Sequence, residues 1–154
     1  MDDPIEAAYR SEHVRLWRAL VGFCRDRELA SEAEAEAWAQ AVRGRSQILN
    51  PAAWVWTAAF RIATGLMAEA NQPMPATAFK DSATEESPAL IELLDLLGEL
   101  SDQQRGCVIL RYVGAMKPAE IAQVLGTTSA SVRVQLHRAH RRLKPTIAAI
   151  REAR

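Results

Sequence analysis

The sequence from residue 128 to residue 143 reads TSASVRVQLHRAHRRL. Apolar side chains recur in it at helical spacing, at Val132, Leu136, Ala139 and Leu143, which gives a helix one apolar face. Four arginines and two histidines occupy many of the other positions. Such a segment is either a helix that reads DNA or a basic amphipathic helix whose charged face is only solvated. The neighbouring sequence decides between these two interpretations.

Two shorter helices and a turn are predicted before this basic segment. The sequence KPAEIAQVLG, residues 117–126, has proline near its start and glycine at its end, as helices often do. Thr128 is well placed to cap the basic helix. Further upstream, SDQQRGCVILRYVG predicts a helix that Ser101 caps and that ends near Gly114. Two short helices, a glycine-containing turn and a longer basic helix make the pattern of a helix-turn-helix.

The N-terminal part is also predicted to be helical, because no alternating run of β-branched residues is bounded by turn residues. Helices are expected at about residues 4–24 and 29–43. A third helix begins after Asn50 and Pro51, where asparagine can cap and proline suits the first turn. The first helix is expected to bury Ile5, Ala8, Leu16, Leu20 and Phe23, and the third carries Trp54, Trp56, Phe60, Ile62, Leu66 and Met67.

A change of composition separates two predicted domains. The segment NQPMPATAFKDSATEESP, residues 71–88, has three prolines and many small polar residues in place of a core pattern, which is typical of a linker. The expected fold is all-α, with two small helical domains at residues 1–70 and 89–154 joined by this linker.

Charge is distributed unevenly between the two ends of the chain. The 154 residues carry no formal net charge, and 49% hydrophobic with 25% charged residues is an ordinary globular composition. From residue 99 onward, ten lysines and arginines outnumber four acidic residues, giving +6, whereas residues 1–98 carry −6. A chain of this kind can bring its basic end to phosphate and offer a different surface to a protein partner.

Other function classes find little support. Cys24 and Cys107 lie far apart and are expected to be buried apolar residues, and the three histidines lack ligand spacing. We find no glycine-rich phosphate loop, nucleophile elbow or zinc-protease signature. The sequence therefore predicts no enzyme, no catalytic residue, no metal, no cofactor and no small-molecule substrate.

The sequence also argues against a membrane protein. Its longest nearly unbroken apolar stretch, AAWVWTAAF at residues 52–60, is far shorter than the roughly 20 residues that a membrane-spanning helix needs. The N-terminal sequence MDDPIEAAYR lacks the basic and apolar regions of a secretory signal. We expect no membrane insertion and a cytoplasmic location.

The C-terminal sequence LSDQQRGCVILRYVGAMKPAEIAQVLGTTSASVRVQLHRAHRRLK, residues 100–144, resembles region 4 of bacterial sigma factors. The resemblance is closest to the small extracytoplasmic-function (ECF) group. The shared elements are Leu100, Arg105, the LRYV of residues 110–113, the EIA of residues 120–122, Leu125, Gly126, Val132 and the LHRA of residues 136–139.

This resemblance implies that the last helix reads the −35 element of a promoter. Carried over by position, Arg133, Val134 and Arg138 lie on the reading face, and arginine can donate two hydrogen bonds to a guanine edge. Near the helix start, where free amides can bind phosphate, lie Thr128, Ser129 and Ser131. The remaining candidates contact the DNA backbone or are only solvated: Arg141, Arg142 and Lys144.

Two residues of this region depart from the family pattern. Lys117 stands where serine or threonine is common, so that the following helix lacks a side-chain cap, for which Pro118 and Glu120 can partly compensate. Gly114 lies one place before the usual glycine of its turn. Neither change is incompatible with the fold.

The N-terminal half resembles region 2 of the same family more distantly. Its segments AAYRSEHVRLWRAL, DRELASEAEAEAWAQAV and NPAAWVWTAAFRIATGLM match the first, the polymerase-binding and the −10-opening helices. The implied polymerase-binding residues are Glu32, Glu36 and Trp38. Glu34 and Ala35, however, stand where an apolar residue and a glutamine are typical, which indicates an altered polymerase surface.

The helix that matches the −10-opening helix has lost most of its cations. Thr57 and Phe60 replace typical arginines, the final basic run is absent, and Arg61 remains. Since neutralisation of phosphate supplies much of DNA affinity, we expect weakened −10 binding. Trp54 and Trp56 are either core residues or platforms for an unpaired base, with the core role favoured.

Three interpretations remain. The first is an ECF-type sigma factor that binds promoter DNA and the RNA polymerase core. The second is a sigma-like regulator with atypical polymerase or −10 binding that needs a partner protein. The third is a sigma mimic that titrates an anti-sigma factor, which the acidic N-terminal half motivates. An anti-sigma factor is a candidate partner of the first type as well.

Overall fold

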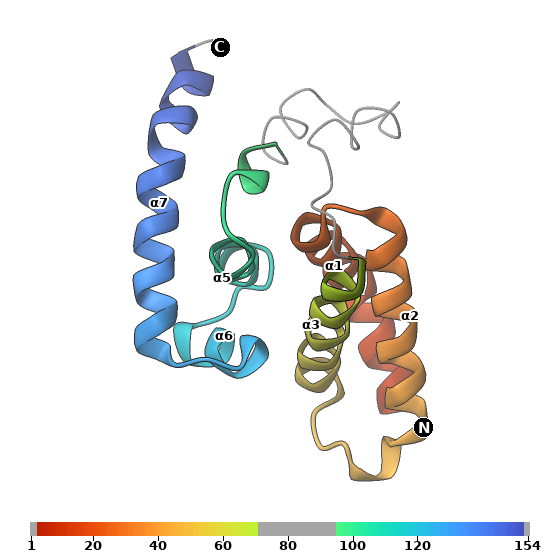
Figure 1. Ribbon diagram of the computed structural model, residues 1–154. Helices are drawn as coiled ribbons and strands as arrows, with labels where there is room; N and C mark the ends of the chain where they lie inside the picture. The colour runs from red at the N-terminus through yellow and green to blue at the C-terminus, as the bar shows by residue number, and fades with distance from the viewer. Residues whose placement is uncertain (1–2, 71–94, 153–154) are drawn as a thin grey trace. The chain divides into compact units, whose positions relative to one another are not determined.

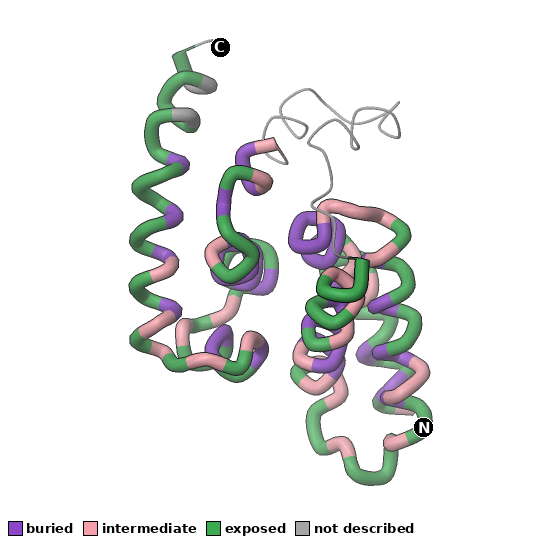
Figure 2. The backbone as a smooth tube through the Cα atoms, in the orientation of Figure 1, coloured by how far each residue is buried: buried purple, intermediate pink, exposed green. Residues whose placement is uncertain are grey.

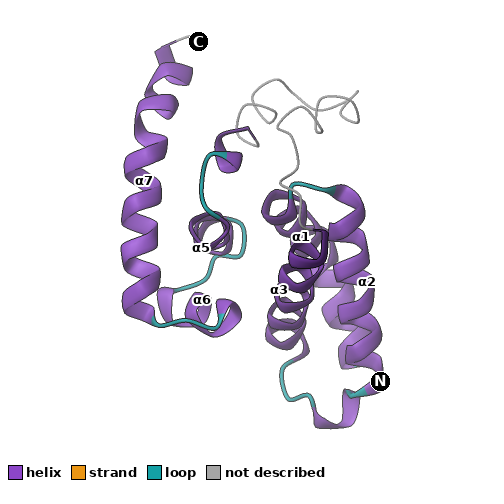
Figure 3. Cartoon of the chain, viewed as in Figure 1, coloured by secondary structure: helices purple, strands orange, loops and turns teal. Residues whose placement is uncertain are grey.

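The structure is a computed structural model that describes residues 3–70 and 95–152. Every regular element within these residues is a helix (Figure 3), as the sequence predicts. The chain divides into two compact units, Met1–Pro73 and Met74–Arg154. The predicted linker at residues 71–88 lies outside the described residues.

The first unit contains three long helices and one short turn of 3₁₀ helix (Figure 1). They are α1 (Pro4–Cys24), α2 (Arg27–Arg43), η1 (Arg45–Gln47) and α3 (Pro51–Ala70). Side-chain oxygens of Asp3 and Asp26 accept hydrogen bonds from the first amides of α1 and α2. Asn50 caps α3 through the amide of Ala53 at 3.2 Å. Helix α2 begins before residue 29 because Asp26, which the sequence analysis did not use, supplies its cap.

The three helices of this unit pack around an apolar core (Figure 2). All five residues predicted to be buried on α1 are buried. Helix α2 contributes only small side chains to much of its buried stripe, namely Ala30, Ala33, Ala37 and Ala41. On α3, Trp56 and Phe60 are fully buried, whereas Trp54, Ile62, Leu66 and Met67 are half-buried. Phe60 packs against Phe23 of α1, with ring centres 4.9 Å apart.

The second unit contains α5 (Asp102–Tyr112), α6 (Pro118–Leu125) and α7 (Ser129–Glu152), and each of these helices contacts the other two. Ser101 caps α5 in a reciprocal capping box with Gln104. In the first turn of α5, the buried guanidinium of Arg105 donates to the carbonyl of Leu100 at 3.1 Å and to Asp102 at 2.7 Å. These two bonds satisfy the buried charge and fix the chain where it enters α5.

The turn between α5 and α6 shows how the chain accommodates a displaced glycine. Ala115 has a left-handed backbone, with φ 53°, which is costly for any residue with a Cβ atom. Gly114 precedes it, and a Cβ atom there would lie 2.7 Å from the carbonyl oxygen of Leu110. Both positions thus favour glycine, and the sequence provides it at only one of them.

The two ends of α6 follow the sequence analysis. Pro118 is its first residue, and the amide of Lys117 donates to the carboxylate of Glu120 at 3.0 Å. This bond and the favourable position of an acidic group near a helix N-terminus compensate for the missing side-chain cap. At the other end, Gly126 has φ 67° and terminates the helix, as predicted.

Both cysteines are buried. Burial raises the pKa of the Cys107 thiol to about 11, because a thiolate is poorly solvated inside the protein. None of the described helices is long and apolar enough to cross a membrane. Among the described residues there is also no group of three side chains that could hold a metal ion.

Candidate DNA interface

One stripe of side chains on helix α7 points into the core of the second unit. The predicted core residues Val132, Leu136, Ala139 and Leu143 are all buried. They contact the rest of the unit through the packing of α7 on α5 and α6. Most side chains of the first four turns of α7 that point away from this stripe are exposed.

The start of α7 is fixed by Thr128. Its hydroxyl accepts a hydrogen bond from the amide of Ser131 at 3.1 Å, and its carbonyl accepts one from the amide of Val132 at 3.0 Å. The first amides of a helix have no partner within that helix, which leaves those of Ser129 and Ala130 available to an anion. The half-buried side chains of Ser129 and Ser131 lie beside this positive helix end.

The outward face of α7 carries the predicted reading residues. Arg133, Val134 and Arg138 are exposed, and 47% exposure is high for a valine. Val134 and Arg138 each follow a buried residue by two positions, a rotation of about 200° at 3.6 residues per turn, so they point away from the core. Arg133 lies beside them on the flank of this face. An exposed valine among arginines can contact a thymine methyl group.

Two further residues, Arg141 and His137, lie on this face. Arg141 is exposed and lies one turn beyond Arg138, on the outward stripe itself. His137 is also exposed, one turn after Arg133 and one turn before Arg141. The sequence analysis did not assign His137 to the interface, although its four-residue spacing from both arginines is visible in the sequence.

The other basic residues of α7 lie at the margin. Arg142 and Lys144 are exposed. His140 is exposed too, but its Nε2 atom is hydrogen-bonded to the phenol of Tyr112 at 2.7 Å. This bond ties α7 to the end of α5 and commits His140 to a structural contact.

The candidate polymerase-binding residues of α2 fall into two environments. Glu32 and Glu36 are exposed. Hydrogen bonds from Gln40 and Arg43, both 3.0 Å long, lower the pKa of Glu36 and keep it ionised. Trp38 is buried, with 8% of its surface exposed. The structure therefore buries Trp38 and exposes the two carboxylates.

The two tryptophans of α3 also differ. Trp56 is 2% exposed, its indole donates to Glu12 at 3.3 Å, and the guanidinium of Arg15 lies 5.3 Å from its ring centre. A ring so enclosed cannot stack on a base, so Trp56 has the core role that the sequence analysis favoured. Trp54 is half-buried and lines an open groove of about 410 Å³ between α2 and α3 together with Gln40, Thr57 and Arg61. Of the −10 candidates, the structure brings together Trp54 and Arg61.

Part of the second unit is similar to known proteins. Residues 90–143 match the family described as Sigma-70, region 4. The RNA polymerase sigma-E factor of Streptomyces coelicolor is 38% identical over 69 residues, 45% of this chain and 39% of that protein. The protein of the same name from Streptomyces avermitilis is 38% identical over 64 residues, 42% of this chain and 36% of that protein.

This chain thus spans about two fifths of the length of these curated relatives. The family match covers α5, α6 and the part of α7 that ends at the buried residue Leu143. The resemblance of this segment to region 4 is therefore confirmed. Residues 90–143 are thus similar to sigma-70 region 4, and part of the chain is similar to two RNA polymerase sigma-E factors.

Proposed function

We propose that this chain is an ECF-type sigma factor that directs RNA polymerase core to promoters. In this proposal α7 reads the −35 element, and the first unit binds core polymerase and the −10 element. The observation that carries the proposal is the arrangement of α7, whose apolar stripe is buried while Arg133, Val134 and Arg138 face outward in a region 4 domain.

The physical basis for DNA reading is direct. A helix enters the major groove with its N-terminal residues against base edges, and arginine forms two hydrogen bonds with guanine. The capped start of α7 provides free amides for one phosphate. Arg141, Arg142 and Lys144 extend the positive surface toward the following phosphates.

The role of the first unit rests on fewer groups. The exposed carboxylates Glu32 and Glu36 offer an acidic patch to core polymerase, and Trp54 and Arg61 offer one aromatic ring and one cation to −10 DNA. Buried Trp38 acts by supporting α2 rather than by direct contact. An anti-sigma factor could bind both units at once, and we expect the protein to act in the cytoplasm.

A second function is favoured by one observation on α3. Phe60 stands where an arginine is typical, and it is 1% exposed and packed against Phe23 and Trp56. This position cannot hold a cation without disrupting the core. The alternative is a sigma-like regulator that reads DNA through α7 but needs a second protein to open the −10 element.

Run-off transcription tests the proposal. The purified chain is added to core polymerase from its native cell with fragments of its own genome. We expect discrete start sites that core alone does not produce and that the double variant Arg133→Ala, Arg138→Ala loses. The absence of any start site would overturn the proposal. Specific DNA binding without a start site would support the regulator instead, if a second cellular protein then produces the start site. Tight binding to an anti-sigma domain without a DNA footprint would support a sigma mimic.

A further inference from the structure

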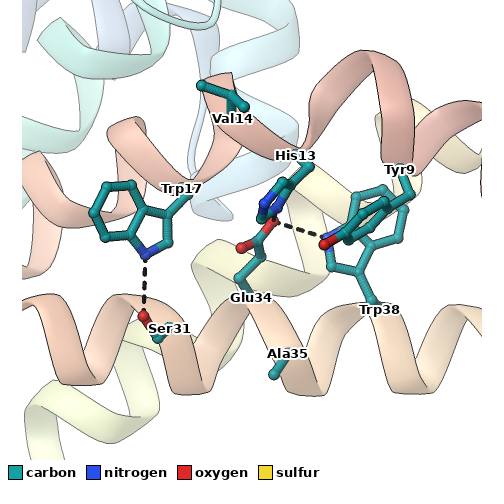
Figure 4. Close-up of a pocket in the computed structure, with 8 residues that line it drawn as sticks. All are labelled: Tyr9, His13, Val14, Trp17, Ser31, Glu34, Ala35 and Trp38. Carbon is teal, nitrogen blue, oxygen red and sulfur yellow. Dashed lines mark hydrogen bonds and ion pairs between the residues drawn. The ribbon is translucent and has the colours of Figure 1, made fainter.

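A groove between α1 and α2 combines aromatic rings with one buried carboxylate (Figure 4). Its volume is about 370 Å³ and it is open to solvent. Trp17 stands at one end and the Tyr9–Trp38 pair at the other, with His13 and Glu34 between them. The proposed function gives Trp38 a supporting role and assigns no ligand to this groove.

Glu34 is an acidic residue whose side chain is buried. Its side chain is 7% exposed, its Oε2 atom is hydrogen-bonded to His13 Nδ1 at 2.6 Å, and the indole of Trp38 donates to the same oxygen at 3.0 Å. The other carboxylate oxygen is turned away from His13 toward the Trp17 end of the groove (Figure 4). One oxygen is thus committed to the protein, and the other faces the groove.

The walls around this oxygen are aromatic, and their rings contact neighbouring side chains. Tyr9 stacks on His13 with ring centres 4.5 Å apart and meets the edge of Trp38 at 5.1 Å. At the far end, the indole of Trp17 donates to Ser31 at 3.0 Å, which fixes the ring. Of the described residues that line the groove, Glu34 alone carries a formal negative charge, and none is a lysine or an arginine.

A carboxylate between aromatic rings is a chemistry that selects cations. The carboxylate forms a charge-assisted hydrogen bond, and the ring faces attract a positive charge electrostatically. Arginine adds a planar group that stacks on aromatic rings. The exposed rim residues Tyr9 and Val14, 42% and 55% exposed, provide apolar contacts for the turns of a helix on either side of such a side chain.

We propose that this groove receives one basic side chain, an arginine or a lysine, from a helical segment of a protein partner. The cation binds the outward oxygen of Glu34 between Trp17 and Tyr9. His13 and Trp38 hold the carboxylate in place from behind. The replacement of the apolar residue typical at position 34 by glutamate is what gives this chain the specificity.

The test measures binding of the side chain alone. N-acetyl-arginine methylamide is titrated into the full chain, and the ¹H–¹⁵N indole resonances of Trp17 and Trp38 are followed by NMR. The matched control compound replaces arginine with citrulline, which has the same shape and no charge. We expect saturable shifts of both resonances with arginine and at least tenfold weaker binding of citrulline.

Variants assign the binding to Glu34. Glu34→Gln should weaken arginine binding at least tenfold, whereas Glu28→Gln, which removes an exposed charge from the same helix outside the groove, should leave it unchanged. Val14→Arg changes an exposed residue and should block the groove without affecting folding. Equal binding of arginine and citrulline, unchanged binding by Glu34→Gln or Val14→Arg, or no shift at either indole would overturn the proposal. Each of these results is independent of whether the chain directs transcription.

Discussion

The hydroxyl of Thr128 accepts a hydrogen bond from the amide of Ser131 at 3.1 Å, and this bond closes the first turn of α7. Thr128→Ala removes it, and loss of such a cap costs about 1 kcal/mol. We expect the unfolding free energy of the second unit to fall by that amount. We also expect α7 to bind DNA more weakly, because its first turn frays.

Thr128→Ser is the matched control. Serine can accept the same hydrogen bond, so its unfolding free energy and DNA affinity should stay near those of the native chain. If Thr128→Ala were as stable as Thr128→Ser in chemical denaturation, the cap would not be what holds the start of α7.

The turn between α5 and α6 predicts opposite effects for two neighbouring substitutions. Ala115→Gly relieves a left-handed alanine and should raise the unfolding free energy by up to about 1 kcal/mol, after the entropic cost of glycine. Gly114→Ala should lower it, because the added Cβ atom would lie 2.7 Å from the carbonyl oxygen of Leu110. Denaturation of the two variants side by side measures both effects, and a change of the same sign in both would contradict this description of the turn.

The tryptophans of α3 should separate stability from DNA binding. Trp56→Ala empties part of the core and should cost about 3–5 kcal/mol. Trp54→Ala should change stability far less, since the ring is half-buried, but it should weaken binding of single-stranded −10 DNA by about 1–3 kcal/mol.

Trp54→Phe keeps an aromatic face and should retain most of that binding. The measurements are thermal unfolding and fluorescence anisotropy with a labelled single strand. A Trp54→Ala variant that binds the single strand as well as the native chain would remove Trp54 from the −10 site.

The buried thiol of Cys107 should be protected from labelling reagents, and it should make the unfolding free energy depend on pH. With a pKa of about 11 in the folded chain and 9.0 as the ordinary value, the folded state holds its proton more tightly than the unfolded state. The resulting stabilisation is therefore complete below pH 9 and is lost as the pH rises toward 11. Denaturation across this range should show the loss in the native chain and a smaller loss in Cys107→Ala. Rapid labelling of native Cys107 at pH 8 would show that the thiol is not buried.

Local sequence signals predicted most of the helices and the core face of α7. The ends of α1 follow from its proline and its apolar period, and Val132 to Leu143 are buried at the predicted spacing. These features depend on interactions within one helix, and a sequence shows them directly.

Features that depend on other helices could not be predicted. Trp54 and Trp56 are equally apolar, and the packing of α1 and α2 decides that Trp56 is enclosed. Glu34 looks like a surface carboxylate until His13, 21 residues earlier, is found 2.6 Å away. Ala115 gives no sequence signal of its left-handed backbone, apart from the displaced glycine beside it.

The central claim is that Arg133 and Arg138 of α7 read base edges. The most direct measurement is the affinity of the full chain for its selected DNA site and for a scrambled site of equal length, at one salt concentration. Arg133→Ala and Arg138→Ala should each lose about 1–3 kcal/mol on the selected site and little on the scrambled one. Arg142→Ala, the matched control, should weaken both sites equally or neither. Full affinity and discrimination in both Arg133→Ala and Arg138→Ala would contradict the account.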